Sequence, residues 1–222
     1  MTNRAAQFVQ LLRSTKKERR LGTVIFFVTS RCNAKCETCF YHEELNRPGD
    51  MTFEQIERVS CTMPAITDLW LSGGEPTLRG DLNEIINLFV RNNGVRRVII
   101  PTNGLLKSRT YAMVDNALSL DEKLHLYLNV ALDGYGETHD RVRGVPGNWE
   151  KTLACIESLY ALKERFRERF RLNVNTVVCA ENYAEIDRLA GFMWENFRLD
   201  GHYFNIIRGD APAFVSPRTT LK

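Results

Sequence analysis

Runs of β-branched and aromatic residues alternate along this chain with longer segments in which apolar residues recur at a helical period. The short runs predict β-strands, because such side chains pack well on a pleated, half-buried surface. We expect strands at 23–29, 68–72, 96–100, 124–132, 171–178 and 203–207. A segment with a helical pattern separates each expected strand from the next, so the chain is predicted to contain six strand–helix units, the last without its helix.

The helical segments carry apolar residues three and four positions apart, which places these residues on one helix face. Two segments show the spacing most clearly, through Leu82, Ile85, Ile86 and Phe89 and through Ile186, Leu189, Ala190 and Met193. Capping boxes predict helix starts at Thr52 with Gln55 and at Asp81 with Glu84. A further amphipathic helix is expected over 5–20.

This alternation predicts an α/β fold in which helices cover a parallel sheet. A complete eight-unit barrel needs about 250 residues, whereas this chain has 222 residues. We therefore expect a partial (β/α)6 TIM-like barrel over 23–210, with an N-terminal helix in 1–22 and a tail at 211–222; a doubly wound sheet is the alternative. In either architecture ligands bind at the carboxyl ends of the strands, so functional residues are expected just after strands.

Composition narrows the class of protein. Hydrophobic residues make up 44% and charged residues 26% of the chain, an ordinary balance for a globular domain. The net charge of +3 does not indicate nucleic-acid binding. The basic cluster in 13–20 is interpreted as a solvated helix face, with a docking patch for an acidic partner as the alternative. We see no run of membrane-spanning length and no secretory signal, so a cytoplasmic protein is expected.

Six cysteines in a reducing compartment are interpreted as thiols or metal ligands. Three stand singly among apolar neighbours and are predicted to be buried: Cys61, Cys155 and Cys179. The other three follow the first expected strand with the spacing Cys-x3-Cys-x2-Cys: Cys32, Cys36 and Cys39. So short a loop can wrap an iron–sulfur cluster with one iron left open, or a zinc ion with a fourth ligand from His42 or Cys61.

Glycine and polar residues follow the next two expected strands. The second strand ends in Gly73, Gly74 and Glu75. The glycines allow the backbone to turn sharply and approach a ligand, and the carboxylate can pair with an ammonium group. Asn103 with Gly104 follows the third strand and predicts either a turn or a ligand-facing loop.

Polar side chains at every second position form a stripe on one face of the later strands. The stripe contains Asn129, Asp133, Asn173, Asn175 and Asn205, with Arg208 at its end. Buried amides need hydrogen-bond partners, so we expect either a satisfied core network or a polar ligand. Beyond the fourth strand, Arg143 can grip a carboxylate, and His139 is interpreted as a loop residue that makes a local hydrogen bond.

The cysteine loop and the Gly73-Gly74-Glu75 segment resemble motifs of the radical S-adenosylmethionine (radical SAM) superfamily, with further likeness over roughly 23–208. The core resembles the peptide-modifying (SPASM-type) and molybdenum-cofactor-biosynthesis branches. The resemblance implies a [4Fe–4S] cluster on Cys32, Cys36 and Cys39, whose open iron binds S-adenosyl-L-methionine. One electron then breaks a carbon–sulfur bond to give methionine and a 5′-deoxyadenosyl radical that abstracts hydrogen from a substrate.

The resemblance also implies residues that contact the cosubstrate. These are Gly73, Gly74 and Glu75 at the methionine moiety, Asn103 and Arg143 nearby, and Asp133 and Asn175 at the ribose or the pocket wall. Two positions depart from the family pattern. Thr38 stands where the family often has an aromatic residue near the adenine, and we expect Phe40 and Tyr41 to take over this packing. Ala131 replaces a serine that contacts the ribose in some relatives.

These motifs do not specify the substrate, which is expected to be a peptide or a small metabolite. The resemblance implies a flavodoxin- or ferredoxin-type reductant. Relatives often carry a C-terminal extension with further cysteines, and none follows Cys179 here; either the protein omits the extension or the chain is a fragment. The competing hypothesis is a non-enzymatic zinc-binding α/β module. An ordinary phosphate-binding barrel enzyme would leave the cysteine loop unexplained.

Overall fold

The computed structural model of the protein describes residues 21–209, 211 and 212. Six strands form one parallel sheet: β1 (Thr23–Thr29), β2 (Asp68–Gly73), β3 (Arg97–Thr102), β4 (His125–Ala131), β5 (Phe170–Val178) and β6 (Gly201–Ile206). All six expected strands are present, with ends shifted by one or two residues at most. The helix expected over 5–20 and most of the expected tail lie outside the described residues.

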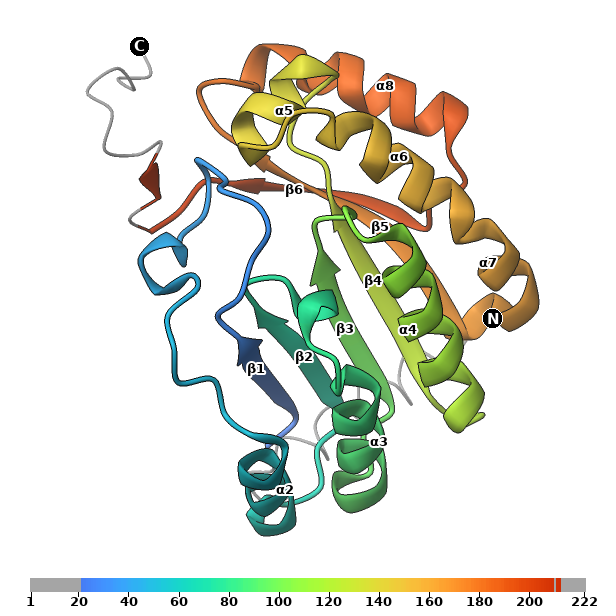
Figure 1. Ribbon diagram of the computed structural model, residues 1–222. Coiled ribbons are helices and arrows are strands. Elements are labelled where there is room, and N and C mark those ends of the chain that lie inside the picture. Colours follow the sequence, from blue (N-terminus) through green and yellow to red (C-terminus); the bar gives the residue numbers. More distant parts are fainter. Residues whose placement is uncertain (1–20, 210, 213–222) are drawn as a thin grey trace, which may run out of the picture.

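Helices occupy the connections between the strands. They are α2 (Phe53–Thr62), α3 (Leu82–Asn93), α4 (Lys107–Leu120), α5 (Glu137–Arg143), α6 (Asn148–Ser158), α7 (Tyr160–Phe166) and α8 (Ile186–Asn196). Figure 1 shows α3, α4, α6 and α7 on one face of the sheet. In the part of the chain that the structure describes, no helix combines the length and the apolar character needed to cross a membrane.

The strand order distinguishes between the two predicted architectures. The strands lie side by side in the order β1-β2-β3-β4-β5-β6, whereas the order in a doubly wound sheet reverses at a switch point. Within residues 21–209, β1 and β6 do not pair with each other, so the sheet stays open. The prediction of a partial (β/α)6 TIM-like barrel is therefore confirmed, and the alternative of a doubly wound sheet is wrong.

The face of the sheet that packs against the helices forms the hydrophobic core. Alternate side chains of the central strands are fully buried there, among them Leu69, Leu71, Val98, Ile100, Leu126 and Leu128. The predicted apolar stripe of α3 packs on them, with Leu82, Ile85, Ile86 and Phe89 all buried. In α8 the predicted stripe is buried at Leu189 and Met193 and half-buried at the two other positions. Apolar alternation thus determined which face of each strand points toward the helices.

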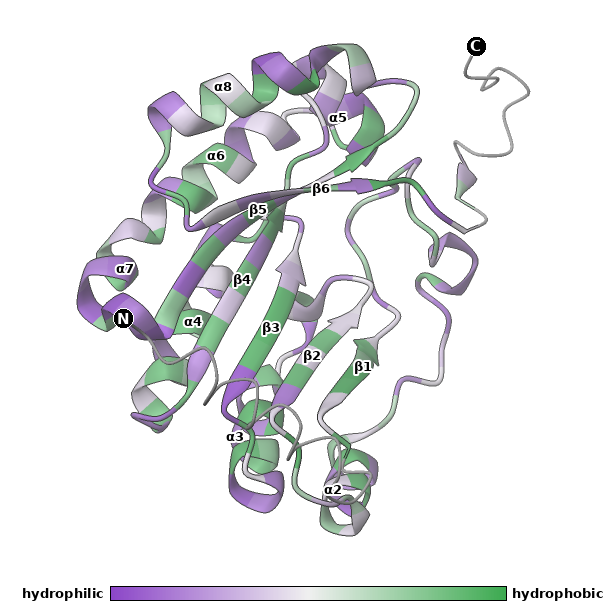
Figure 2. Cartoon of the chain, turned by 180° about the vertical axis from the view of Figure 1, so that it is seen from behind, coloured by the Kyte–Doolittle hydropathy of each residue, from purple (hydrophilic) through white to green (hydrophobic). Residues whose placement is uncertain are grey.

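The opposite, concave face of the sheet carries a different set of side chains, and Figure 2 shows it from the side without helices. Its β1–β2 part contributes Ile25, Phe27 and Trp70, all large apolar side chains that remain partly exposed. Its β4–β5 part contributes Asn129 and Asn173, which lie directly opposite each other in the register of the two strands. The concave face is therefore apolar and partly exposed on its β1–β2 side and carries buried amides on its β4–β5 side.

One of the two predicted capping boxes is present. At the start of α2, the Thr52 hydroxyl accepts from the Gln55 amide and the Gln55 side chain accepts from the Thr52 amide. The capping box predicted at Asp81 is wrong, because that side chain makes no cap hydrogen bond. Its carboxylate instead binds the Arg79 guanidinium through two hydrogen bonds of 2.7 and 3.0 Å. The bidentate pair with the guanidinium takes the place of the cap, because it provides two charge-assisted hydrogen bonds between opposite charges.

Candidate active site

The segment that carries the three cysteines leaves β1 and is fastened at its root. Asp50 accepts hydrogen bonds from the Thr29 hydroxyl at 2.6 Å and from the Ser30 amide at 2.7 Å. Burial acts to raise the pKa of Asp50, but these bonds lower it overall, which favours the charged carboxylate. The Cys32 amide donates to the Asn46 side chain at 3.0 Å. Sequence reasoning missed both anchors, because they lie 14 to 21 residues from their partners.

A second attachment of the loop comes from the end of α5. The Glu37 amide donates to the Val142 carbonyl at 2.9 Å, and the Lys35 amide donates to the Arg143 carbonyl at 3.2 Å. Gly144 ends the helix with φ +64, and a Cβ there would lie 2.4 Å from the Lys35 carbonyl oxygen. The backbone on both sides of the middle cysteine is thus held by carbonyls that an α-helix leaves unpaired at its C-terminus.

The thiols of Cys32, Cys36 and Cys39 lie close enough to influence one another electrostatically. Burial raises the pKa of each thiol, and the charge of a neighbouring cysteine of the set raises it further. The positive charge of Arg143 opposes this effect at all three thiols. Three soft, partly buried donors on one anchored loop fit the chemistry of a [4Fe–4S] cluster with one iron left open.

Zinc coordination was the alternative for this loop. In residues 21–209, 211 and 212, no group of three or more His, Cys, Asp or Glu side chains is arranged to hold a single metal ion. His42, predicted as an optional fourth ligand, contacts the Cys39 carbonyl oxygen through Nδ1 at 3.1 Å.

The three remaining cysteines are not all buried. Cys155 and Cys179 are buried as predicted, and burial raises the pKa of Cys155 to about 11. The prediction for Cys61 is wrong, because this residue is exposed on α2. The buried positions of that helix are Ile56 and Ser60. One further residue turns a side chain by about 100°, which carries Cys61 away from the core.

The two glycines after β2 pack against the root of the cysteine loop. A Cβ on Gly73, where φ is +130, would lie 2.1 Å from the Thr29 carbonyl oxygen, and a Cβ on Gly74 would lie 2.2 Å from that of Arg31. The amides of Gly74 and Glu75 donate to these same oxygens at 2.8 and 2.7 Å. The predicted sharp turn is therefore present, and the backbone that it approaches is that of the cysteine loop.

Glu75 is a buried carboxylate surrounded by neutral donors. Its Oε1 accepts from the Thr77 amide, the Thr77 hydroxyl and the Thr102 hydroxyl, at 3.1, 2.7 and 2.9 Å. Its Oε2 accepts from the Asn103 amide at 2.7 Å. None of these partners carries a positive charge. The geometry therefore suits a cationic ligand, because a buried carboxylate is stabilised most by an opposite charge.

Asn103 connects the third strand exit to the cysteine loop. Its side-chain amide donates to the Asn33 side chain at 2.7 Å, and its Oδ1 accepts from the Leu105 amide at 3.0 Å. Gly104 has φ +74, so the predicted Asn-Gly turn is present. The same residue thus makes a turn and contacts the segment between Cys32 and Cys36.

Asp133 and Arg143 form a buried ion pair beside the cysteines. Nη1 of Arg143 lies 2.9 Å from Oδ2 of Asp133, and Oδ1 of Asp133 accepts from the Val177 amide at 2.7 Å. Burial acts to lower the pKa of Arg143, but Cys36 and Asp133 raise it overall. The Nε atom of Arg143 is buried without a hydrogen-bond partner among the described residues. Such an atom can donate to a bound ligand.

His139 lies behind this pair. It belongs to α5, so its predicted place in a loop is wrong, but the predicted local hydrogen bond is present: Nδ1 accepts from the Asp133 amide at 2.9 Å. Burial, with the nearby charge of Arg143, lowers the pKa of His139 to about 3. The imidazole is therefore neutral and supports Asp133.

The polar stripe on the concave face is partly a satisfied network. The Asn173 side chain donates to Asn129 at 3.1 Å. Asn175 lies opposite Ala131 and is half-buried. Asn205 continues the stripe on β6 and is exposed. The stripe is therefore hydrogen-bonded within itself at Asn129 and Asn173, whereas Asn175 and Asn205, nearer the carboxyl ends of the strands, are more exposed.

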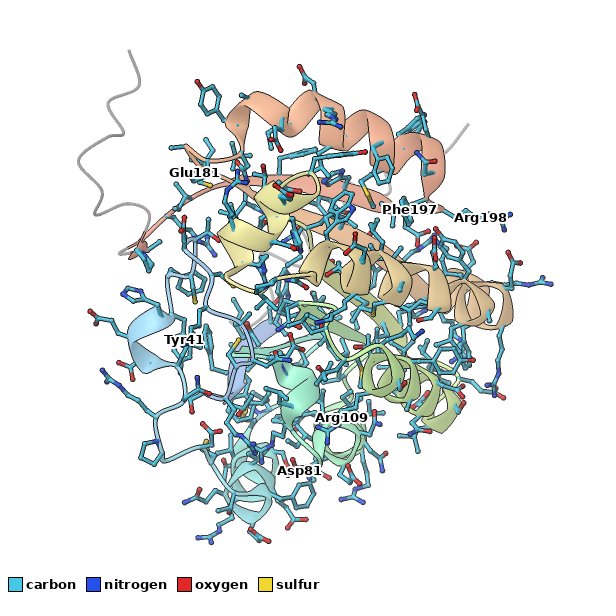
Figure 3. The ribbon with its side chains drawn as sticks, turned by 45° about the horizontal axis from the view of Figure 1, so that its top comes forward. Tyr41, Asp81, Arg109, Glu181, Phe197 and Arg198 are labelled. Carbon is cyan, nitrogen blue, oxygen red and sulfur yellow. The ribbon has the colours of Figure 1, made fainter. Side chains whose placement is uncertain are left out.

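The two aromatic residues that follow the third cysteine make contacts at the rim of the barrel. Tyr41 packs against Phe27, with ring centroids 4.9 Å apart. Phe40 is half-exposed, and the Arg208 guanidinium lies 5.5 Å from its ring centroid. This contact joins the cysteine loop to the exit of β6. Figure 3 is turned toward this end of the molecule; the labelled Tyr41 follows the third cysteine, and Glu181 follows β5.

Comparison with known proteins agrees with this geometry. The family model described as the Radical SAM superfamily matches residues 26–193. An AdoMet-dependent heme synthase of Methanosarcina barkeri is 32% identical over 197 residues, covering 86% of this chain and 53% of the relative. A GTP 3′,8-cyclase of Rhodopirellula baltica is 32% identical over 162 residues, covering 70% and 42%. The chain thus spans about half the length of these relatives or less.

Solved structures share the fold. Streptococcus suis SuiB bound to S-adenosylmethionine superposes with a TM-score of 0.62 at 18% identity, covering 95% of this chain and 46% of SuiB. Methylornithine synthase (PylB) gives a TM-score of 0.58 at 15% identity, covering 87% and 56%. Since the family match spans most of the chain and includes the cysteine loop, Gly73-Gly74-Glu75, Asp133 and Arg143, the chain belongs to the radical SAM superfamily of enzymes.

Proposed function

We propose that Cys32, Cys36 and Cys39 hold a [4Fe–4S] cluster, and that S-adenosyl-L-methionine binds at its open iron. When bound, these groups would supply reductive cleavage of the carbon–sulfur bond, giving methionine and a 5′-deoxyadenosyl radical that abstracts hydrogen from a substrate. The observation that carries the proposal is the position of three cysteines on a short loop whose root is hydrogen-bonded directly to the Gly73-Gly74-Glu75 turn.

The residues of the chain would bind the two ends of the methionine moiety. Glu75 has neutral partners, so its carboxylate is suited to accept from the cosubstrate ammonium. Arg143 has an unpartnered Nε, so its guanidinium is suited to the cosubstrate carboxylate. Gly73 and Gly74 would act mainly by holding Glu75 against the cysteine loop, and Asn103 by bridging to Asn33.

The adenosine moiety would lie toward the rim and the later strands. Phe40 offers an exposed ring for the adenine. Asn175 is half-buried on the concave face, and we propose that it contacts the ribose. Both oxygens of Asp133 are already bonded, so this residue would line the pocket and act through Arg143.

We propose that the substrate binds at the concave face, near the apolar side chains of Ile25, Phe27 and Trp70 and the amides of Asn129 and Asn173. A peptide or a small metabolite would fit such a mixed surface. Relatives named as heme synthases and as a GTP cyclase favour a small metabolite, and a SuiB structure is bound to a precursor peptide. A flavodoxin- or ferredoxin-type reductant would supply the electron. All six cysteines are free thiols, in keeping with the cytoplasm.

Anaerobic reconstitution with iron and sulfide tests the proposal. Wild-type protein is expected to bind about four irons and four sulfides, to show the spin resonance of a reduced cubane, and to form 5′-deoxyadenosine from S-adenosylmethionine and dithionite. Replacing Cys32, Cys36 or Cys39 with Ala should abolish all three properties. Exposed Cys61→Ala is the matched control and should retain them. A colourless protein that binds one tight zinc would instead support the zinc-binding module.

A further inference from the structure

The backbone of Arg143 is hydrogen-bonded to the loop that carries the three thiols. The Arg143 carbonyl accepts from the Lys35 amide, and Lys35 directly precedes Cys36. The adjacent Val142 carbonyl accepts from the Glu37 amide, which follows Cys36. Because backbone on both sides of the middle cysteine is bonded to the last turn of α5, the spacing between this cysteine and Arg143 is restricted.

Asp133 fixes the other end of the Arg143 side chain. Its carboxylate is fully buried, binds Nη1 of Arg143 at 2.9 Å and accepts from the Val177 amide at 2.7 Å. The Asp133 amide in turn donates to Nδ1 of His139. The carboxylate therefore holds the guanidinium in place and also cancels part of its charge.

A positive charge in this position favours added negative charge nearby. The Arg143 side chain is only 13% exposed and that of Asp133 is 0% exposed, so solvent screens their fields weakly. One-electron reduction of the proposed site adds one negative charge and breaks no bond. The electron comes from an external one-electron donor of the ferredoxin or flavodoxin class.

We propose that Arg143 sets how readily the cluster site is reduced, and that Asp133 limits this effect by neutralising part of the arginine's charge. The inference rests on the proposed function, because it concerns the cluster on Cys32, Cys36 and Cys39. It is separate from binding of the cosubstrate carboxylate, since the charge acts whether or not the cosubstrate is present.

The test is an anaerobic redox titration of reconstituted protein, followed by spin resonance without S-adenosylmethionine. Arg143→Met keeps the apolar stem and removes the charge. We expect it to make reduction about tenfold less favourable, which is ~59 mV for a one-electron couple. Asp133→Asn removes the opposing charge and should shift the equilibrium in the other direction, by about threefold or more. Arg143→Lys should stay within about threefold of wild type.

Arg165→Met is the matched control. It removes one positive charge from α7, shortly before the amino end of β5 and so at the opposite end of the strands from the site. Its side chain is mostly exposed and pairs with Asp115. We expect its reduction equilibrium to lie within about twofold of wild type.

The outcomes separate this inference from the function on which it rests. If wild-type protein binds no iron and sulfide after reconstitution, the proposed function is overturned, and the inference with it. An intact cluster in Arg143→Met with an unchanged midpoint would overturn the inference alone. If Arg143→Met assembles no cluster, Asp133→Asn decides: a shift toward easier reduction supports the inference, and no shift or the opposite shift overturns it.

Discussion

The two faces of the sheet are built from neighbouring residues of the same strands, yet they differ in burial and in the polarity of their side chains. On the helix-covered face, side chains such as Ile100 and Leu128 are fully buried and apolar. On the concave face, Ile25 is 62% exposed, and Asn129 and Asn173 bond to each other. A face that is covered by helices can maximise apolar burial, whereas the concave face keeps polar and partly exposed side chains.

The largest expected effect comes from matched Ile→Ala changes on the two faces. Ile100→Ala should lower the free energy of unfolding by about 2–5 kcal/mol, because it leaves a cavity in the core. Ile25→Ala should cost about 1 kcal/mol or less, since most of that side chain is already exposed. Urea denaturation followed by circular dichroism measures both. Equal losses would contradict the distinction between the helix-covered face and the concave face.

A second prediction concerns the rim where the two faces end. Gly74→Ala places a Cβ 2.2 Å from the Arg31 carbonyl oxygen, so the backbone of the cysteine loop must move. We expect a loss of about 1–3 kcal/mol from overpacking, together with weaker retention of iron after reconstitution. Gly80→Ala is the control, because no atom lies within 4 Å of its Cβ position. A Gly74→Ala variant with wild-type stability and iron content would show that the loop tolerates displacement.

A third prediction uses pH to test the burial of His139, which accepts a hydrogen bond from the Asp133 amide. The pKa of His139 is about 3 in the folded protein and about 6.5 in an unfolded chain. As the pH falls from about 6.5 toward 3, the imidazole of His139 becomes protonated in the unfolded state but stays neutral in the folded state. Unfolding should therefore become easier by up to ~1.4 kcal/mol per pH unit. Denaturation of wild type and His139→Asn between pH 4 and 8 measures the slope, which should be smaller in the variant.

The smallest expected effect separates the bonded end of the amide stripe from its open end. Asn173→Ala removes the donor to Asn129 and should cost about 1 kcal/mol. Asn175→Ala should leave stability nearly unchanged and instead weaken binding of S-adenosylmethionine, as calorimetry on reconstituted protein would detect. If Asn175→Ala is the more destabilising change, its role is structural and its proposed ribose contact loses support.

Periodic patterns predicted most of the fold, because they record which side of each element faces the core. The six strands and the apolar stripe of α3 are local features, readable within about ten residues. The predictions for Asp81 and Cys61 failed because each side chain had an alternative environment that the local pattern did not reveal. Asp81 bound Arg79 instead of its own helix, and Cys61 lies one position beyond the buried face of α2.

The three cysteines within eight residues and the Gly-Gly-Glu segment after a strand could be recognised from the sequence alone, because neither motif needs a distant partner. The way in which these two segments are joined depends on the tertiary structure. It brings the α5 carbonyls, 105 to 108 residues away, to the amides of Lys35 and Glu37, and it packs Gly73 and Gly74 against the root of the cysteine loop. It also pairs Arg143 with Asp133. Such contacts depend on how whole helices and strands pack against each other, and the spacing of residues within a short segment does not predict that packing.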